Sequence, residues 1–133
     1  MIIDSHCHAW TYWPYQPPVP DPETRGSVEQ LINEMDLNGV DRALVVCAQI
    51  DHNPDNNAYV AEQTVRYPTR LHQLVDLDSE WSPTYHTPGA ALRLRQMAWR
   101  WPICGFTHYL RKGESAAWLY SDDGLELLRA AAD

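Results

Sequence analysis

The chain has 133 residues and a formal net charge of −8, which arises from 10 basic and 18 acidic residues. Because no basic stripe is present to meet phosphates, we expect no nucleic-acid partner and no membrane partner. With 44% hydrophobic and 21% charged residues, the composition excludes a disordered chain, and no apolar run approaches the ~18 residues of a membrane span.

Residues 2–10, IIDSHCHAW, predict a first strand with an unusual set of polar side chains. Strand residues alternate between two faces, so Asp4, His6 and His8 are expected on one face and Cys7 on the other. Two neutral imidazoles on one face can hold a divalent ion, at about 2.0–2.1 Å for zinc. The strand therefore predicts part of a metal site, with His6 and His8 as ligands.

A proline-rich loop, residues 11–26, follows this strand and contains five of the 10 prolines. It is longer than an ordinary connection, which indicates a functional or a disordered segment. Trp10, Tyr12, Trp13 and Tyr15 could form an aromatic lid over a pocket, or they could cover the rim of the fold in a purely structural way.

The next segment, residues 27–39, predicts a helix with both ends marked. Ser27 is a favourable N-cap, Gln30 completes a capping-box pattern and Gly39 is a natural C-terminal stop. Residues 40–50, VDRALVVCAQI, form a nearly continuous apolar run, which predicts a strand buried on both faces.

Further helices and strands alternate in the rest of the chain. Asn53 is expected to cap a helix that begins at Pro54, and Thr87 with Pro88 repeats this start in the third helix. Ser121 is the expected cap of the last helix. The remaining predicted elements are strands within 69–78 and 103–110, and a helix from 121 to the last residue, 133.

Strand and helix alternate four times, which predicts an α/β fold with parallel strands and right-handed crossovers. Units of this length suit a (β/α)8 TIM barrel or a doubly wound sheet. A barrel closes with eight strands over about 250 residues, and four units alone would leave two unpaired strand edges, which natural proteins avoid. We therefore expect residues 1–133 to be one domain, the N-terminal half of a (β/α)8 barrel and a fragment of a longer protein.

In a barrel the working site lies at the carboxyl ends of the strands, where four of the 6 histidines are expected. These four are His6, His8, His52 and His108. At the end of the fourth strand, His108 could orient a substrate carboxylate or shuttle a proton, or it could simply bond to a neighbouring loop. We take His108 as the candidate catalytic residue. His72 is expected inside the third strand and His86 before the third helix.

Three widely spaced cysteines, Cys7, Cys47 and Cys104, argue against a disulfide framework. Cys47 and Cys104 lie in apolar runs and are expected to be buried small hydrophobic residues. The first residues lack the basic start and apolar run of a signal peptide. A cytoplasmic, reducing location is therefore expected.

The opening IIDSHCH, followed by AW, resembles the start of the amidohydrolase superfamily in its amidohydrolase-related (type 2) branch. Residues 31–46, LINEMDLNGVDRALVV, and 56–71, NNAYVAEQTVRYPTRL, are similar to the second and third units of that branch. GFTHYL at 105–110, with WL at 118–119, resembles the fourth-strand region of its sugar-lactone and dicarboxylate-lactone hydrolases. The resemblance extends along the whole chain.

This resemblance implies a (β/α)8 barrel hydrolase in which His6 and His8 match the first-strand metal ligands. The further histidine ligands of the branch and its last-strand aspartate have no counterpart here, which again indicates a fragment. GFTHYL carries no metal-bridging lysine or glutamate, so the resemblance implies one divalent ion, with zinc expected. Some lactone-hydrolysing relatives work without a metal and use the same histidines for the substrate.

The expected function is metal-dependent hydrolysis of a lactone or amide C–O or C–N bond by a metal-activated water, with the 133-residue piece inactive by itself. A decarboxylase of the same branch is one alternative, because the branch includes both chemistries. A non-catalytic half-barrel that assembles with itself or with a C-terminal half is another. The expected partner of the enzyme is a small-molecule substrate, a lactone or a carboxylate.

Overall fold

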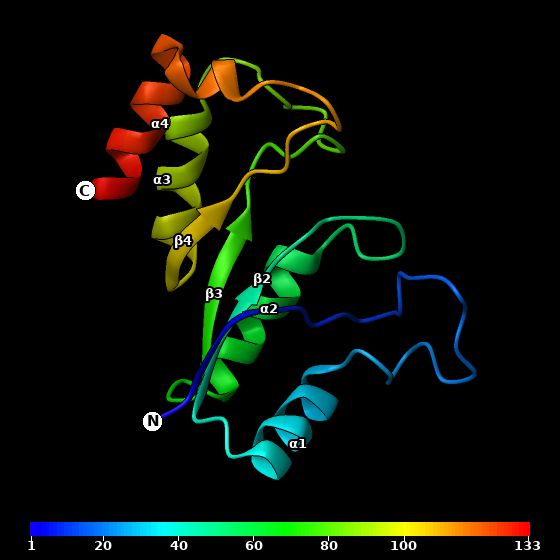
Figure 1. Ribbon diagram of the computed structural model, residues 1–133. Helices are drawn as coiled ribbons and strands as arrows, with labels where there is room; N and C mark the ends of the chain where they lie inside the picture. Colours follow the sequence, from blue (N-terminus) through cyan, green and yellow to red (C-terminus); the bar gives the residue numbers. More distant parts are fainter.

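Four strands and four α-helices alternate along the chain in the computed structural model, which describes residues 1–133 (Figure 1). The strands are β1 (Ile3–Cys7), β2 (Arg42–Val46), β3 (Leu71–Asp76) and β4 (Ile103–Thr107). The helices are α1 (Val28–Asn38), α2 (Asn56–Arg66), α3 (Ala90–Arg100) and α4 (Asp122–Ala132), with a short 3₁₀ helix, η1 (Ala116–Tyr120), before α4. None of the helices has both the length and the apolar character needed to cross a membrane.

All four strands are parallel and lie in their chain order, β1-β2-β3-β4. A doubly wound sheet reverses its strand order at a switch point, whereas a (β/α)8 barrel adds each strand beside the previous one. The structure is therefore an α/β half-barrel, which confirms the predicted fold. Because the strands are parallel, their carboxyl ends point the same way, and the loops that follow the strands all leave from that end of the sheet (Figure 1).

Helix α1 has the ends that its sequence marks. The Ser27 side chain accepts a hydrogen bond from the backbone N–H of Gln30. Gly39 ends the helix with φ 65°, in the left-handed region that strains residues with a side chain. Both predicted ends are confirmed, but the capping box is not, because the Gln30 side chain donates to Glu34 at 2.8 Å and the Ser27 N–H donates to the Thr24 carbonyl at 3.1 Å.

The predicted start of α2 is wrong by two residues, since the helix begins at Asn56 rather than Pro54. Asn53 does not cap it. The Asn53 side-chain oxygen instead accepts hydrogen bonds from the backbone N–H groups of residues 11 and 12, at 3.1 and 3.2 Å. This side chain therefore fixes the loop after β1 to the loop before α2.

The predicted start of α3 is also two residues early, because the helix begins at Ala90 and Gly89 precedes it. The Thr87 hydroxyl donates to the Thr84 carbonyl at 2.8 Å and so closes a turn in the loop. Short polar side chains satisfy either a helix start or a turn, and the local sequence does not decide between them.

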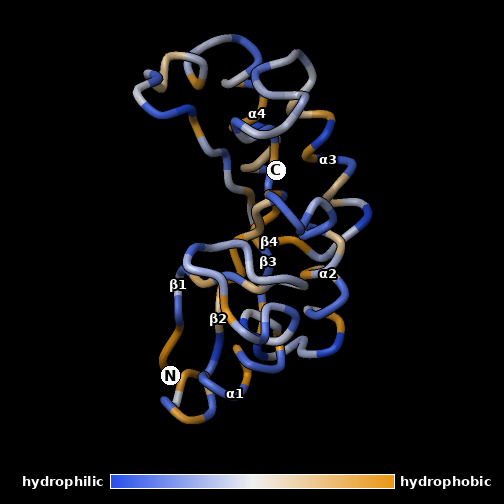
Figure 2. Tube along the Cα trace, turned by 90° about the vertical axis from the view of Figure 1, so that its right-hand side faces the viewer, coloured by the Kyte–Doolittle hydropathy of each residue, from blue (hydrophilic) through white to orange (hydrophobic).

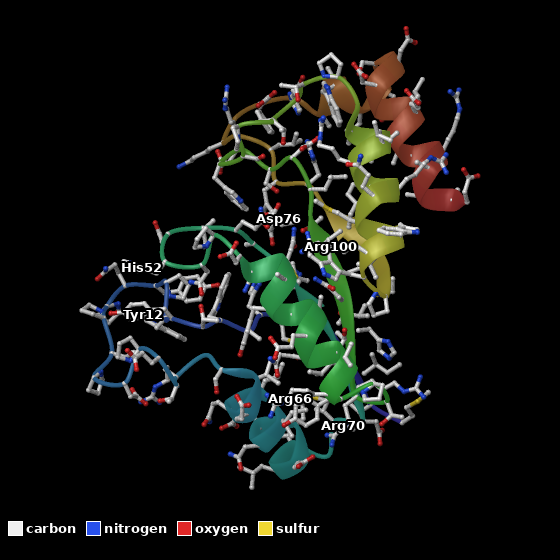
Figure 3. All side chains as sticks on the ribbon, turned by 180° about the vertical axis from the view of Figure 1, so that it is seen from behind. Tyr12, His52, Arg66, Arg70, Asp76 and Arg100 are labelled. Carbon is white, nitrogen blue, oxygen red and sulfur yellow. The ribbon has the colours of Figure 1, made fainter.

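Two hydrophobic clusters attach the helices to the sheet. The first cluster contains Ala9, Val28, Met35, Ala43, Val45, Cys47, Val60 and Leu71, and the second contains Val75, Leu77, Ala90, Leu94 and Leu127. Figure 2 shows β4 as a mainly apolar segment in the middle of the molecule, and Figure 3 shows α2 and α3 in front of the strands when the molecule is seen from behind. Leu44 and Leu74 alternate with the core residues of their strands and remain partly exposed. The clusters therefore cover one face of the sheet.

The three cysteines are free and differ in exposure. Cys47 is buried in the first cluster, as predicted, and burial raises its pKa to about 12. The prediction that Cys104 is buried is wrong, because this residue is exposed. Ile103 and Gly105 pair with two consecutive residues of β3, so Cys104 is the extra residue of a β-bulge on an edge strand.

Cys104 is expected to be the first of these thiols to react. Burial raises the pKa of all three thiols, to about 12 for Cys7 and Cys47, so each is protonated at neutral pH, and Cys104 is the one that is exposed to a reagent. Brief treatment of the native protein with iodoacetamide, followed by peptide mass spectrometry, should find the label on Cys104 before the other two. Faster labelling of Cys47 would contradict this placement.

Candidate functional site

A buried side chain on the first turn of α2 ties together the ends of β1 and β2. The Asn56 side-chain oxygen accepts a hydrogen bond from the Ala48 backbone N–H at 3.0 Å. Its amide nitrogen donates to the Ala9 carbonyl at 2.8 Å. Asn56 is only 2% exposed, and these bonds satisfy polar groups that water cannot reach.

The next residue of α2, Asn57, hydrogen-bonds through its side chain to the backbone at the end of β3. Its amide nitrogen donates to the Asp76 carbonyl at 2.9 Å, and its side-chain oxygen accepts from the Asp76 backbone N–H at 2.8 Å. The buried Asp76 carboxylate in turn accepts from the Gln49 backbone N–H and the Trp81 indole N–H, both at 2.7 Å. Ser79 donates its hydroxyl to the same carboxylate. Asp76 lies at the end of β3, beside the start of α2 (Figure 3), and holds the loops after β2 and β3.

His6 and His8 lie next to one another at the carboxyl end of β1. Their ring centroids are 5.1 Å apart, and the ring planes meet at 81°. His6 is exposed, whereas His8 is half-buried and stacks on Trp10 with a centroid distance of 5.3 Å. The two imidazoles are thus close enough to converge on one small ligand.

A β-bulge in β1 changes the direction of Asp4. Asp4 and Cys7 pair with two core residues of β2 that share a face, so one extra residue is inserted between them. Asp4 therefore lies on the face of Cys7, and the expectation that it shares a face with His6 and His8 is wrong. The Asp4 carboxylate accepts a hydrogen bond from the His6 backbone N–H at 3.0 Å, which stabilises the bulge.

The His8 ring has a fixed tautomer. Its Nδ1 lies 2.7 Å from the Val46 carbonyl oxygen, which can only accept, so Nδ1 carries the proton and Nε2 keeps its lone pair. Burial lowers the pKa of His8, and the nearby His6 lowers it further, against the opposing effect of the Val46 hydrogen bond. His8 is therefore neutral at neutral pH, which is the form that binds a metal through Nε2.

The 11–26 loop closes on itself beside His8. The Trp10 backbone N–H donates to the Gly26 carbonyl at 2.7 Å, and a Cβ on Gly26 would lie 2.8 Å from a Trp10 ring carbon, so only glycine fits there. Trp10 is buried and meets Tyr15 edge-on at 5.8 Å. A hollow of about 230 Å³ is lined here by His8, Trp10, Trp13 and Tyr15, among others. Trp10 is thus buried against His8 and Tyr15 and lines the hollow together with Trp13 and Tyr15.

His108 follows β4 and pairs with His86, which lies in the loop between β3 and α3. Their Nε2 atoms are 3.2 Å apart, and the ring planes differ by only 11°. Trp118 of η1 stacks on His86 at 4.6 Å and on His108 at 4.9 Å. Tyr85 stacks on His86 at 3.8 Å. Two parallel rings this close to one imidazole must lie on its opposite faces, so the histidine pair is enclosed between Tyr85 and Trp118.

The outer nitrogens of this pair have different neighbours, a hydrogen-bonded carbonyl for His108 and a carboxylate in ion-pair contact for His86. His108 Nδ1 lies 3.0 Å from the Leu77 carbonyl oxygen, and His86 Nδ1 lies 3.2 Å from a Glu114 carboxylate oxygen. The Tyr85 hydroxyl donates to the other Glu114 oxygen at 2.6 Å, and this bond is the main cause of the lowered pKa of Glu114. Glu114 is therefore ionised beside His86. Burial lowers the pKa of His86, and Glu114 opposes this effect.

The structure brings His6 and His8 together but places His108 elsewhere. β1 and β4 are the opposite edges of the sheet, with two strands between them. His52 packs against Tyr12 with a ring distance of 4.7 Å, and Figure 3 shows these two side chains together on the loops. Of the four strand-end histidines, only His6 and His8 are thus adjacent.

The sequence did not indicate that His86 and Glu114 lie beside His108. His86 is 22 residues from His108, so no local spacing links the two. Glu114 belongs to a loop with no motif of its own. No group of three or more His, Cys, Asp or Glu residues in the structure is arranged to hold a metal ion.

No protein-family model and no curated protein matches the chain. Among solved structures, the chain matches a probable 2-pyrone-4,6-dicarboxylic acid hydrolase from Acinetobacter baumannii, which has citric acid bound. The TM-score is 0.65 and the sequence identity is 20%. The match covers 98% of this chain and 45% of the hydrolase. The chain also matches a 5-carboxyvanillate decarboxylase from Novosphingobium aromaticivorans, a mutant with manganese and 3-methoxy-4-hydroxy-5-nitrobenzoic acid bound. The TM-score is 0.64 and the sequence identity is 17%. The match covers 99% of this chain and 48% of the decarboxylase.

Both neighbours are members of the amidohydrolase superfamily. At this level of identity the likeness establishes the fold, which is that of the TIM-barrel amidohydrolases over about half of their length. The chain thus spans 45% and 48% of the two proteins that it matches. The resemblance drawn from the sequence is confirmed at the level of the fold.

Replacement of Asn57 by alanine is expected to lower the free energy of unfolding by about 3 kcal/mol, because it leaves the buried N–H and C=O groups of Asp76 without partners. Asn33, which is exposed on α1, provides the control, and Asn33→Ala should change the stability by less than about 0.5 kcal/mol. Urea unfolding followed by circular dichroism measures both variants. Equal stabilities of the two would show that the Asn57 bonds contribute nothing.

Proposed function

We propose that this chain carries the first-strand part of a mononuclear divalent-metal site in a barrel enzyme that hydrolyses a lactone or an amide. The observation that supports this most is the arrangement of His6 and His8, with rings 5.1 Å apart and with the His8 Nδ1 held by the Val46 carbonyl. The pair lies at the carboxyl end of a barrel strand, where enzymes of this fold place their chemistry. A divalent ion there would activate a water molecule and polarise a carbonyl group.

Each residue around this pair has a distinct task in the proposal. His6 and His8 present neutral imidazole nitrogens, and the Val46 carbonyl keeps the His8 ring in the tautomer that leaves Nε2 free. Trp10 covers one face of His8 and excludes water from it. Trp13 and Tyr15 line the adjoining hollow of about 230 Å³, which Arg25, Gln30 and Glu34 also line. Its aromatic rings would pack against a flat, ring-containing lactone or carboxylate.

We favour zinc, because imidazole nitrogens suit this ion and neither lysine nor glutamate is present in 105–110 to bridge a second one. Manganese remains a comparison for the test, since the decarboxylase neighbour binds it. The other ligands would come from further strands of a complete barrel. His108, enclosed with His86, is assigned to a separate group rather than to this ion. A cytoplasmic location belongs to the same proposal.

Decarboxylation of a carboxylated ring has equal support as a second candidate. The decarboxylase and the hydrolase match this chain almost equally well, with TM-scores of 0.64 and 0.65. A half-barrel that assembles through its edges is a third candidate, because β1 and β4 each have a side with no strand partner. Such edges accept further strands from the same chain or from another one.

The test uses the whole protein, supplied with zinc or manganese and assayed with lactones, amides and carboxylated aromatic acids. Ring opening or amide cleavage is followed by acid release, and decarboxylation by release of CO2. His8→Asn should lower kcat/KM by at least about 100-fold, because loss of a partner behind a ligand already costs 10–100-fold. His52→Asn, which removes an exposed histidine outside both pairs, should leave kcat/KM unchanged.

Wild-type turnover in both His6→Ala and His8→Ala would overturn the proposal. Activity that survives chelation but is lost in His8→Asn would show that the histidines act on the substrate without a metal. Release of CO2 without any hydrolysis would select the decarboxylase.

A further inference from the structure

A second hollow, of about 320 Å³, lies where the 11–26 loop meets the loop between β2 and α2, and we call it the loop hollow. Three aromatic residues of the first loop line it, Tyr12, Trp13 and Tyr15, and Asp51 lines it from the second loop. Figure 3 shows Tyr12 where these two loops lie together. Trp13 and Tyr15 also line the hollow beside the first histidine pair, so the two hollows adjoin.

Asn53 joins the two loops and so fixes the walls of the loop hollow. Its side-chain oxygen accepts from the backbone N–H groups of residues 11 and 12, and its amide nitrogen donates to the Tyr12 carbonyl at 2.8 Å. Across the first loop, the Trp13 backbone N–H donates to the Pro22 carbonyl at 2.7 Å. Asn53 is buried. Because these bonds already order both loops, little further ordering is needed when a ligand binds.

The aromatic rings offer surface in more than one direction. Trp13 and Tyr15 meet edge-on, with their ring centroids 5.1 Å apart and their planes at 82°. Tyr12 and Tyr15 are 37% and 40% exposed, so a ligand can reach both rings. The faces of tryptophan and tyrosine rings attract cations through their quadrupoles.

The charge in the loop hollow also favours a cation. Asp51 is exposed, and its carboxylate forms no ion pair. Its backbone has φ 41°, in the left-handed region that residues with a side chain seldom adopt, and a bond from the Asn53 N–H to the Ile50 carbonyl closes the turn that holds it there. Neither lysine nor arginine lines the hollow, and the whole chain has a net charge of −8. An anion would therefore be repelled and a cation attracted.

We propose that the loop hollow binds a small organic cation with a methylated ammonium group, of the type found in choline. The rings contact the methyl groups, over which the positive charge is spread, and Asp51 supplies the opposite charge. A primary ammonium group would instead need acceptors for its three N–H donors, and only one carboxylate lines the hollow. The volume lies at the lower end of the range for small-molecule sites, which limits the ligand to a small one.

This proposal goes beyond the function proposed above and does not depend on it, because His6 and His8 take no part in the binding. The test accordingly measures binding and not turnover. Failure of the cation site would leave the proposed enzyme activity unaffected, and the reverse also holds.

Isothermal titration calorimetry of the full chain with choline tests the proposal. The matched control ligand is 3,3-dimethylbutanol, in which an uncharged carbon replaces the ammonium nitrogen. Choline should bind at one site per chain and at least about fivefold more tightly than the control, because a contact between opposite charges contributes about this factor even at the dielectric constant of water. Equal binding of the two would overturn the proposal and show a merely apolar hollow.

Asp51→Asn should weaken choline binding at least about fivefold, because it removes the only acidic group that lines the hollow. Asp55→Asn is the matched control, since Asp55 is an exposed residue before α2 whose side chain makes no capping bond, and it should leave the binding unchanged. Circular dichroism confirms that both variants are folded. Choline affinity that is the same in Asp51→Asn and in the unaltered chain would contradict the proposal.

Nitrogen NMR of the unaltered protein gives an answer that does not depend on the folding of any variant. The indole N–H signal of Trp13 should shift as choline is added, whereas that of Trp99, which is 91% exposed on α3, should not. A Trp13 signal that stays in place at saturating choline would show that the cation does not occupy the loop hollow.

Discussion

Strands of a parallel sheet end with backbone groups that have no further strand to pair with, and in this chain two asparagines of α2 supply the missing partners. Asn56 bonds to the segments that follow β1 and β2, and Asn57 bonds twice to Asp76 at the end of β3. Each such buried group would cost about 1–3 kcal/mol if it were unpaired. The bonds therefore allow α2 to pack on the sheet in one register only, and the loops that carry the histidines start from fixed positions.

The carbonyl groups near these strand ends then orient the histidines. His8 follows β1 and donates its Nδ1–H to Val46 on the neighbouring strand, and His108 follows β4 and donates to Leu77, just past its neighbouring strand. The same arrangement thus occurs twice, once near each edge of the sheet. The Nε2 of His8 is left free by this bond, whereas the Nε2 of His108 meets the Nε2 of His86 at 3.2 Å. The repeated βα unit explains the recurrence, because each unit places the first residue after its strand beside the end of an adjacent strand.

Much of the fold could be predicted from the sequence, because it depends on patterns that are local. Apolar runs marked the strands, and Ser27 and Gly39 marked the ends of α1 through bonds within a few residues. Features that depend on register could not be predicted in this way. The bulges that turn Asp4 toward the core face and expose Cys104 exist only relative to a neighbouring strand.

The same distinction applies to the site. His6 and His8 are two residues apart, so their adjacency could be inferred from strand geometry. The partner of His108 could not, because His86 lies in another unit, 22 residues earlier. For Asn53 a local role was predicted where the actual contact is distant. This residue is typical of a helix cap, but its side chain bonds to the loop after β1, about 42 residues away in the chain.

The closed base of the 11–26 loop allows the shape of the hollow to change without a change in the position of the His8 ring. The Trp10–Gly26 bond and the glycine-only contact between these residues fix the loop where it meets His8. Beyond this base the loop can gain or lose residues at little entropic cost, because the closure penalty grows slowly with length. Divergence of the sequence at the loop tip can therefore alter which molecules enter the aromatic hollow and leave the imidazole geometry of β1 intact. The fold thus permits the loop tip and the histidine pair to change independently of one another.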